Sequence, residues 1–137
     1  MVRIATEEDY DLAFDLAWTF VNQAYGNFAD KDEVRDLVAH LIRDDDKVFL
    51  IGDGGFLAGL THKFILGYKR MAIELGWYVD PSKRGTGIGK ALMDGFEDWA
   101  KIMNCDLITM ISIDDEVGKY YEKRGYKLYE RTYMKEI

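Results

Sequence analysis

The sequence predicts an α/β protein in which strands and helices alternate along a single domain, residues 1–137. Three observations carry this prediction. Hydrophobic residues make up 48% of the chain, which is enough for a buried core. The apolar pattern switches repeatedly between the two-residue period of strands and the three-to-four-residue period of helices. Glycine, aspartate and the single proline stand where the period changes.

The first half of the chain predicts one short strand, two helices and a hairpin. Residues 2–5 alternate as a strand, and Thr6 is placed to cap a helix that Gly26 ends. A second helix is expected over residues 30–43, where apolar residues recur with helical spacing. Asp53-Gly54-Gly55 lies between two apolar runs, a pattern typical of a β-hairpin.

The second half predicts three more strands and two more helices. They are a long strand over 70–79, an amphipathic helix over 88–103, a short buried strand over 107–111, a helix over 115–124 and a closing strand from Tyr126 onward. Asp80-Pro81 ends the long strand, Asp114 can cap the last helix, and Gly125 suits its end. The expected order is strand, two helices, three antiparallel strands, helix, strand, helix, strand.

Charge and cysteine content narrow the classes of function. A formal net charge of −7 disfavours the electrostatic attraction that nucleic-acid-binding proteins use, and it mildly favours cationic substrates. His40, His62 and Cys105 have no metal-ligand spacing, and one cysteine cannot close an intrachain disulfide. The sequence has no apolar run of transmembrane length and no secretory segment at its start. We expect a cytoplasmic protein without metal, nucleic-acid or membrane partners, either monomeric or a homodimer.

Residues 84–90 read RGTGIGK, and three glycines at alternate positions disfavour both helix and strand. They follow the long strand and open a helix, where backbone amides lack partners and the helix dipole favours an anion. A P-loop is disfavoured, because Arg84 stands in place of its first glycine and Ala91 in place of its Ser/Thr. The dinucleotide-binding pattern fails as well, because Lys90 occupies the position of its third glycine.

Arg84, Gly87 and Gly89 do fit the pattern [QR]-x-x-G-x-[GA]. Within the phrase ELGWYVDPSKRGTGIGKALM, and with the later block DDEVGKYYEKRGYKL, this pattern resembles the GNAT (Gcn5-related N-acetyltransferase) superfamily. The resemblance implies a mixed, mostly antiparallel central sheet of about six to seven strands with about four helices on both faces. One departure is Asp114, where relatives often carry asparagine.

The resemblance implies an acetyl-coenzyme A (acetyl-CoA)-dependent N-acetyltransferase. Such an enzyme passes the acetyl group directly, within a ternary complex, to a primary amine of a small molecule or peptide. It also implies that the pyrophosphate of acetyl-CoA binds backbone amides of the glycine stretch, and that amides near Trp77 and Val79 polarise the thioester carbonyl. The implied cofactor-binding residues are Trp77, Val79, Arg84, Gly85, Thr86, Gly87, Ile88, Gly89 and Lys90.

Glu74 is the candidate general base. An amine of pKa ~10.4 must lose a proton before it attacks, and a carboxylate acting through water can accept that proton. Glu74 is the only acidic residue inside its strand, and two-residue alternation would place it on one face with Ala72, Gly76 and Tyr78. A solvent-facing strand residue is the competing interpretation.

Tyr121 matches the tyrosine that faces the coenzyme's sulfur in many relatives, so the resemblance makes it the second candidate catalytic residue. Aromatic packing is its alternative role, and we expect the neighbouring Tyr120 to be core. A different class of function also stays open, namely a non-catalytic coenzyme A-binding module on the same fold, which would not need Glu74 or Tyr121.

Overall fold

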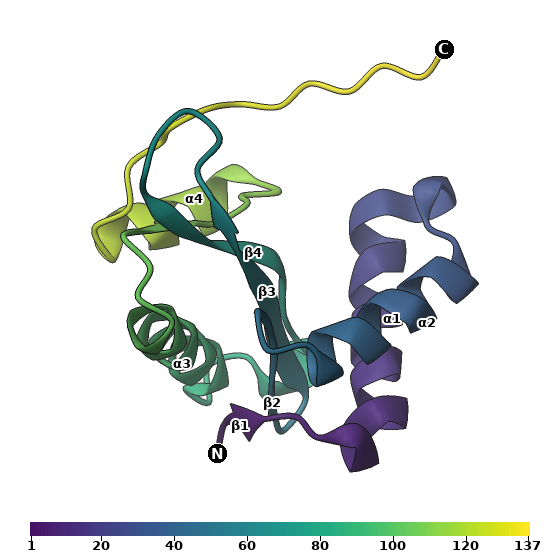
Figure 1. The fold of residues 1–137 in the computed structure, drawn as a ribbon. Helices are drawn as coiled ribbons and strands as arrows, with labels where there is room; N and C mark the ends of the chain where they lie inside the picture. The colour runs from purple at the N-terminus through teal and green to yellow at the C-terminus, as the bar shows by residue number, and fades with distance from the viewer.

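A computed structural model describes residues 1–137. In chain order the elements are β1 (Arg3–Ile4), a 3₁₀ turn (Glu7–Asp9), α1 (Tyr10–Tyr25), a 3₁₀ turn (Gly26–Phe28), α2 (Lys31–Arg43), β2 (Lys47–Gly52), β3 (Gly55–Lys63), β4 (Arg70–Val79), a 3₁₀ turn (Pro81–Lys83), α3 (Ile88–Ile102), β5 (Leu107–Thr109) and α4 (Asp115–Lys123). They form three layers, with α1 and α2 on one face of the sheet and α3 and α4 on the other (Figure 1).

The sheet has five strands in the order β1-β2-β3-β4-β5. The first four pair antiparallel, and β5 runs parallel to β4, with Met71–Ile73 beside Leu107–Thr109. This confirms the predicted α/β class and its mixed, mostly antiparallel sheet. The strand count is five rather than six to seven.

Each helix layer buries its own core against the sheet. Phe14, Phe20 and Val38 of the first two helices pack on Phe49 and other β-strand residues. On the opposite face the buried side chains include Leu92, Met93, Phe96 and Trp99 of α3, with Tyr121 of α4. Because both faces are covered, any polar side chain that points out of the middle of β4 enters a low-dielectric environment.

A β-bulge in β4 changes which residues share a face. Ala58 pairs with Gly76 while the next residue of β3, Gly59, pairs with Glu74, so Leu75 is an extra residue in β4. An extra residue reverses the alternation of side chains beyond it. Gly76 lies against the α1 ring of Phe20, whereas Glu74 lies on the α3/α4 side. The predicted common face is therefore wrong for Gly76 and Tyr78, whereas Ala72, on the same side of the bulge as Glu74, lies on the α3/α4 side as expected.

The closing strand expected from Tyr126 onward is also not formed. The last backbone hydrogen bond of the chain runs from the amide of Tyr126 to the carbonyl of Tyr121, at 3.1 Å. Beyond it the chain runs extended and away from the sheet (Figure 1). A strand depends on pairing with a neighbour, and residues 127–137 have none. Separately, none of the four helices combines the length and the apolar character that crossing a membrane requires.

Candidate active site

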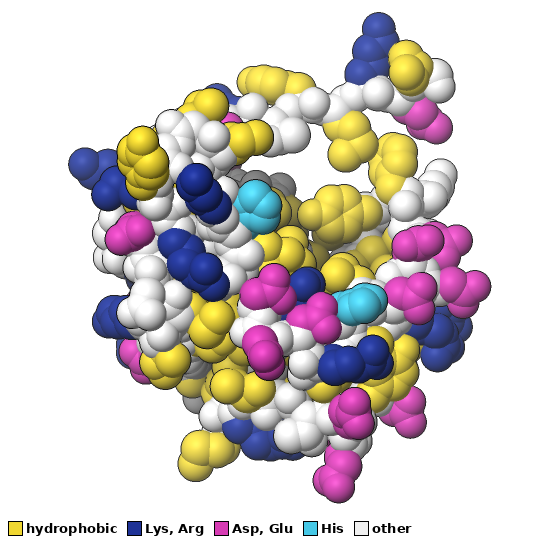
Figure 2. Space-filling view, in the orientation of Figure 1, with side chains coloured by type: hydrophobic (Ala, Val, Ile, Leu, Met, Phe, Trp, Pro, Cys, Tyr) yellow, Lys and Arg dark blue, Asp and Glu magenta, His cyan; other side chains and the backbone are white.

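The site forms where β4 and β5 separate. Their pairing stops at Ile73 and Thr109, although β4 continues to Val79. A pocket of about 30 Å³, room for about one water molecule, opens at this point. Its walls come from α1, β4, the segment after β5 and α4: Phe20, Tyr25, Glu74, Leu75, Trp77, Ile111, Ile113, Val117 and Tyr121. Figure 2 shows a hollow lined largely by hydrophobic side chains, with the C-terminal end of the chain, residues 127–137, running above it in this view.

Glu74 is the only carboxylate in the pocket lining, and it is 2% exposed. Its Oε1 accepts a hydrogen bond of 3.2 Å from the backbone amide of Ile111. Burial raises the pKa of Glu74 to about 7, although the Ile111 amide and the Tyr121 hydroxyl both favour the charged form. A carboxyl with this pKa both accepts and releases a proton near neutrality, as a general base must. The solvent-facing interpretation of Glu74 is wrong.

Tyr121 is 5% exposed and lines the same pocket. Its hydroxyl donates a hydrogen bond of 3.0 Å to the carbonyl of Ile111. Burial, and next the negative charge of Glu74, raise the pKa of this hydroxyl, so it stays protonated and serves as a hydrogen-bond donor. Tyr120 is less buried than Tyr121, and its ring packs on Trp77 with 5.3 Å between centroids.

Beyond the point where β5 separates from β4, one edge of the β4 backbone has no strand beside it. The amide of Asp80 donates to the carbonyl of Gly54 in the β2–β3 turn, so by strand alternation the amides of Trp77 and Val79 point the other way. No strand pairs with them there, because β5 has already diverged. Nε of Arg84 donates to the carbonyl of Val79 at 2.9 Å, which ties the glycine stretch to the end of β4.

The three glycines of residues 84–90 are required for two different reasons. Gly85 and Gly87 have φ of 81° and 93°, a region that side chains with Cβ rarely adopt, although a Cβ there would meet nothing within 4 Å. A Cβ on Gly89 would lie 3.3 Å from the Trp77 ring. The conformation of the turn and close packing on β4 therefore select glycine in this structure.

That turn leaves a row of unpaired amides. None of the backbone amides from Gly85 to Lys90 donates a hydrogen bond within the protein, and the amide of Arg84 makes only a long one, 3.4 Å, to Pro81. These amides open α3, so the helix dipole adds partial positive charge at the same place. The donor set fits a phosphate or pyrophosphate. The Lys90 ammonium is paired with Asp94 at 2.9 Å, which leaves the backbone as the main anion-binding group.

The sequence matches the Acetyltransferase (GNAT) family over residues 6–126. This chain belongs to the GNAT acetyltransferase family. GNAT acetyltransferases use acetyl-CoA, and the unpaired amides described above suit its pyrophosphate. No group of three or more His, Cys, Asp or Glu side chains is arranged to hold a metal ion.

Related proteins and solved structures agree with this GNAT assignment. The aminoglycoside N(6')-acetyltransferase type 1 of Stenotrophomonas maltophilia is 28% identical over 111 residues, 74% of this chain and 72% of that protein. The Clostridium acetobutylicum predicted acetyltransferase, solved with acetyl-CoA, is 17% identical and has a TM-score of 0.82, covering 99% and 95% of the two chains. A Trypanosoma brucei acetyltransferase is 22% identical at TM-score 0.73, covering 100% and 99%. The chain is thus a GNAT N-acetyltransferase.

Two features of this GNAT site were missed by sequence reasoning. Ile111 links both candidate catalytic residues through its amide and its carbonyl, but backbone groups leave no mark in a sequence. Leu75 is the extra residue of the bulge, and its insertion places Glu74 on the opposite side of the sheet from Gly76. The signal for it is faint: Gly59 on β3 has a Cβ position only 2.5 Å from the carbonyl of Ile73, so it must be glycine beside the bulge.

Proposed function

We propose that this GNAT protein transfers the acetyl group of acetyl-CoA directly to a primary amine bound in the pocket between α1 and β4. The observation that carries the proposal is Glu74, a buried carboxyl with a pKa of about 7 at the point where β4 and β5 separate. Acetyl-CoA supplies the acetyl group as a thioester, and its pyrophosphate binds the amides of residues 84–90.

Glu74 accepts the proton of the attacking amine. An ammonium of pKa ~10.4 is a poor donor to a carboxylate of pKa about 7, but the apolar walls lower the pKa of the bound amine. The pocket has room for about one water beside the Glu74 carboxylate, so the amine approaches that water from the open side of the pocket. The proton moves through this water to Glu74 as the nitrogen bonds to the acetyl carbon.

Two other groups act on the acetyl thioester. The unpaired amides of Trp77 and Val79 hydrogen-bond to the carbonyl oxygen as it gains negative charge. The one hydroxyl proton of Tyr121 turns from the Ile111 carbonyl to the departing thiolate and is donated to it in a hydrogen bond. A thiol of pKa ~8.5 needs no full proton transfer from tyrosine, whose own pKa is higher, so a hydrogen bond is sufficient.

The pocket lining indicates the class of acceptor. The pocket where the amine would bind is lined by apolar and aromatic side chains, and it contains no carboxylate other than Glu74. These side chains include Phe20, Tyr25, Leu75, Ile111 and Ile113. A polycationic aminoglycoside, the substrate class in the name of the Stenotrophomonas relative, needs several anionic partners. We therefore expect an acceptor with one primary amine on an apolar or aromatic body.

The test measures the release of the coenzyme A thiol from acetyl-CoA with amines that carry either one or several amino groups. We expect 2-phenylethylamine to exceed kanamycin and spermidine in kcat/KM by about tenfold or more, a difference of about 1.4 kcal/mol in transition-state binding. Faster turnover of kanamycin or spermidine overturns the acceptor class. Binding of acetyl-CoA without thiol release for any amine in the panel overturns the proposed transfer.

A further inference from the structure

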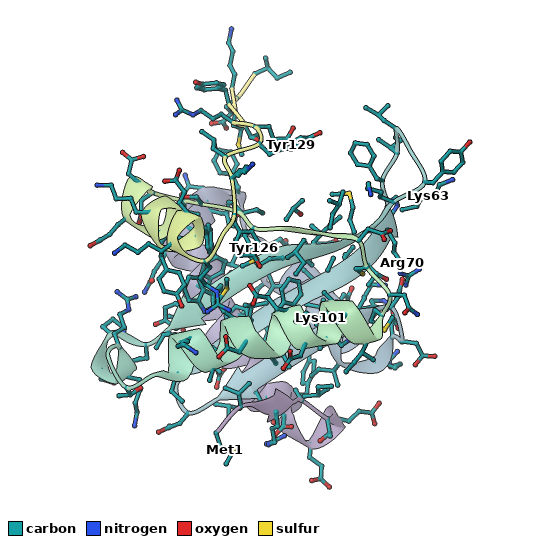
Figure 3. All side chains as sticks on the ribbon, turned by 90° about the vertical axis from the view of Figure 1, so that its left-hand side faces the viewer. Met1, Lys63, Arg70, Lys101, Tyr126 and Tyr129 are labelled. Atoms are coloured by element: carbon teal, nitrogen blue, oxygen red, sulfur yellow. The ribbon has the colours of Figure 1, made fainter.

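The turn between β3 and β4 projects beyond the sheet. Lys63 and Arg70 form the last pair of the two strands, and residues 64–69, here called the hairpin tip, lie outside it. Two backbone hydrogen bonds, of 2.8 and 3.2 Å, close the tip, and Phe64 takes part in both. In Figure 3 the tip beyond Lys63 stands clear of the helices and apart from the C-terminal end of the chain near Tyr129. The tip is thus an ordered turn that projects from the body of the protein.

The hairpin tip exposes three large apolar side chains. Ile65 is 87% exposed, Leu66 is 83% exposed and Tyr68 is 98% exposed. No other part of the chain covers them, although removing each from water would be favourable. Single exposed apolar residues are common on protein surfaces, but three within four positions on a projecting turn are typical of a contact surface.

The hairpin is basic, although the protein as a whole is acidic. Lys63, Lys69 and Arg70 stand at the two sides of the turn. Residues 54–73 contain no aspartate or glutamate, in a chain whose formal net charge is −7. The cations of this region are therefore concentrated around the exposed apolar side chains, and the positive charge is local to the hairpin.

These cations are not neutralised within the protein. No carboxylate forms an ion pair with any of the three. The carboxylate of Asp106, at the base of the hairpin, accepts from the backbone amide of Arg70, whose guanidinium donates to the Thr61 hydroxyl. The ammonium of Lys63 lies 5.8 Å from the centre of the Tyr68 ring. The three charges are available to an anionic partner.

This combination of shape, apolar side chains and charge fits the surface of an anionic lipid bilayer. Aliphatic side chains enter the boundary of the acyl chains, and a tyrosine ring is favoured at the level of the headgroups. Lysine and arginine beside them reach the lipid phosphates with their charged ends. A nucleic acid would leave the aliphatic side chains in water, and a protein partner would need a pocket shaped to the tip.

We propose that the hairpin tip inserts into the headgroup region of an anionic bilayer, with Lys63, Lys69 and Arg70 contacting lipid phosphates. The acidic remainder of the surface is repelled by the same bilayer, so the hairpin is the part that faces it. No membrane partner was expected from a chain without a spanning run, but contact at the surface needs no such run. The inference does not depend on the acceptor or on the catalytic roles.

Sedimentation with lipid vesicles tests the contact. One set of vesicles is phosphatidylcholine alone, and the other contains about one third phosphatidylglycerol, which is anionic. We expect binding to be about tenfold or more stronger on the anionic vesicles, and to weaken as salt rises from about 0.05 to about 0.5 M. Equal binding to the two kinds of vesicle overturns the proposal. So does no binding to either, which would leave a protein as the partner of the hairpin.

A first pair of variants tests the apolar side chains of the tip. Ile65→Ser with Leu66→Ser should weaken binding to the anionic vesicles about tenfold or more, because the aliphatic groups that enter the bilayer are lost. The control is Leu12→Ser with Ile102→Ser, which removes two exposed apolar side chains from α1 and α3. Both variants should keep the circular dichroism of the wild type. An equal loss of binding in the two variants contradicts insertion of the tip.

A second pair of variants tests the cations. Lys63→Gln with Lys69→Gln should also weaken binding to the anionic vesicles about tenfold or more, and should make it less sensitive to salt. The control is Lys101→Gln with Lys123→Gln, which removes the same charge from exposed positions on α3 and α4. An equal effect of the two variants would show that binding follows net charge, and would reject the hairpin as the contact.

Discussion

The carboxyl of Glu74 on β4 accepts a hydrogen bond from the amide of Ile111 across the gap where β4 and β5 diverge. The carbonyl of the same Ile111 accepts from the hydroxyl of Tyr121. One residue of the diverging chain thus positions both the proposed base and the proposed donor. Because these contacts are buried, removing one side chain should change chemistry more than binding.

Replacing Glu74 by glutamine should lower kcat about 10²- to 10⁴-fold, because the proton acceptor is lost while the shape of the side chain is kept. In the wild type kcat should rise with pH through an apparent pKa near 7, since the carboxylate form is active, and the variant should lack this step. Steady-state thiol release across pH 5.5–9 measures both. Glu122→Gln, an exposed acid on α4, is the control. A variant that retains wild-type kcat rejects Glu74 as base.

The same substitution should stabilise the fold at alkaline pH. The folded pKa of Glu74, about 7, lies above its ordinary value of 4.5, so between these values the folded protein binds more protons than the unfolded chain. Stability from this group is full below about pH 4.5 and falls as pH rises through 7. Between pH 5 and pH 8 the free energy of unfolding of the variant, measured in urea, should rise by about 2–3 kcal/mol relative to that of the wild type. If the free energy of unfolding of the wild type and of the variant depends on pH in the same way, the pKa of Glu74 is not raised in the folded protein.

Tyr121→Phe should lower kcat about 10- to 100-fold, because a hydrogen bond to a charged group contributes about 1.5–3 kcal/mol. Its dissociation constant for acetyl-CoA should stay within about threefold. Tyr120→Phe is the matched control, since the adjacent ring packs on Trp77 and lies outside the pocket lining. Equal kcat values for the two variants would argue for a packing role at Tyr121.

Gly87→Val should abolish acetyl-CoA binding in titration calorimetry while the protein stays folded by circular dichroism. Valine disfavours φ of 93°, so the turn must change and the row of amides is lost. Gly26→Val controls for strain, because Gly26 also has a positive φ and open space around its Cβ position. Unchanged affinity in the Gly87 variant would mean that the coenzyme does not bind this turn.

Ile113→Asp should move the acceptor preference from 2-phenylethylamine toward spermidine, because it places a second carboxylate in an apolar wall of the pocket. Ile113 is 57% exposed, so the charge is tolerated. Ile102→Asp, at an exposed position on α3, carries the same charge outside the pocket lining. The ratio of the two kcat/KM values should change about tenfold only in the Ile113 variant. An equal change in both would indicate long-range charge instead.

Local pattern predicted much of the fold. The strand over 70–79, the turn at Asp53-Gly54-Gly55 and the cap at Asp114, which accepts from the Val117 amide at 2.8 Å, are all as expected. Each depends on residues within a few positions of one another. The bulge at Leu75 was not predicted, because it follows from how β3 and β4 pair. The closing strand from Tyr126 failed for the same reason, since propensity without a partner does not make a sheet.

The residue order alone specified the helices, the long strand and a glycine turn with free amides, because backbone conformation and helix-end hydrogen bonding are set by near neighbours. Only the packed molecule decided that Glu74 is buried, that its pKa rises, and that Ile111 joins it to Tyr121. Those properties arise from residues as far apart as positions 74 and 111, and the loss of water around a charge exists only after the layers close.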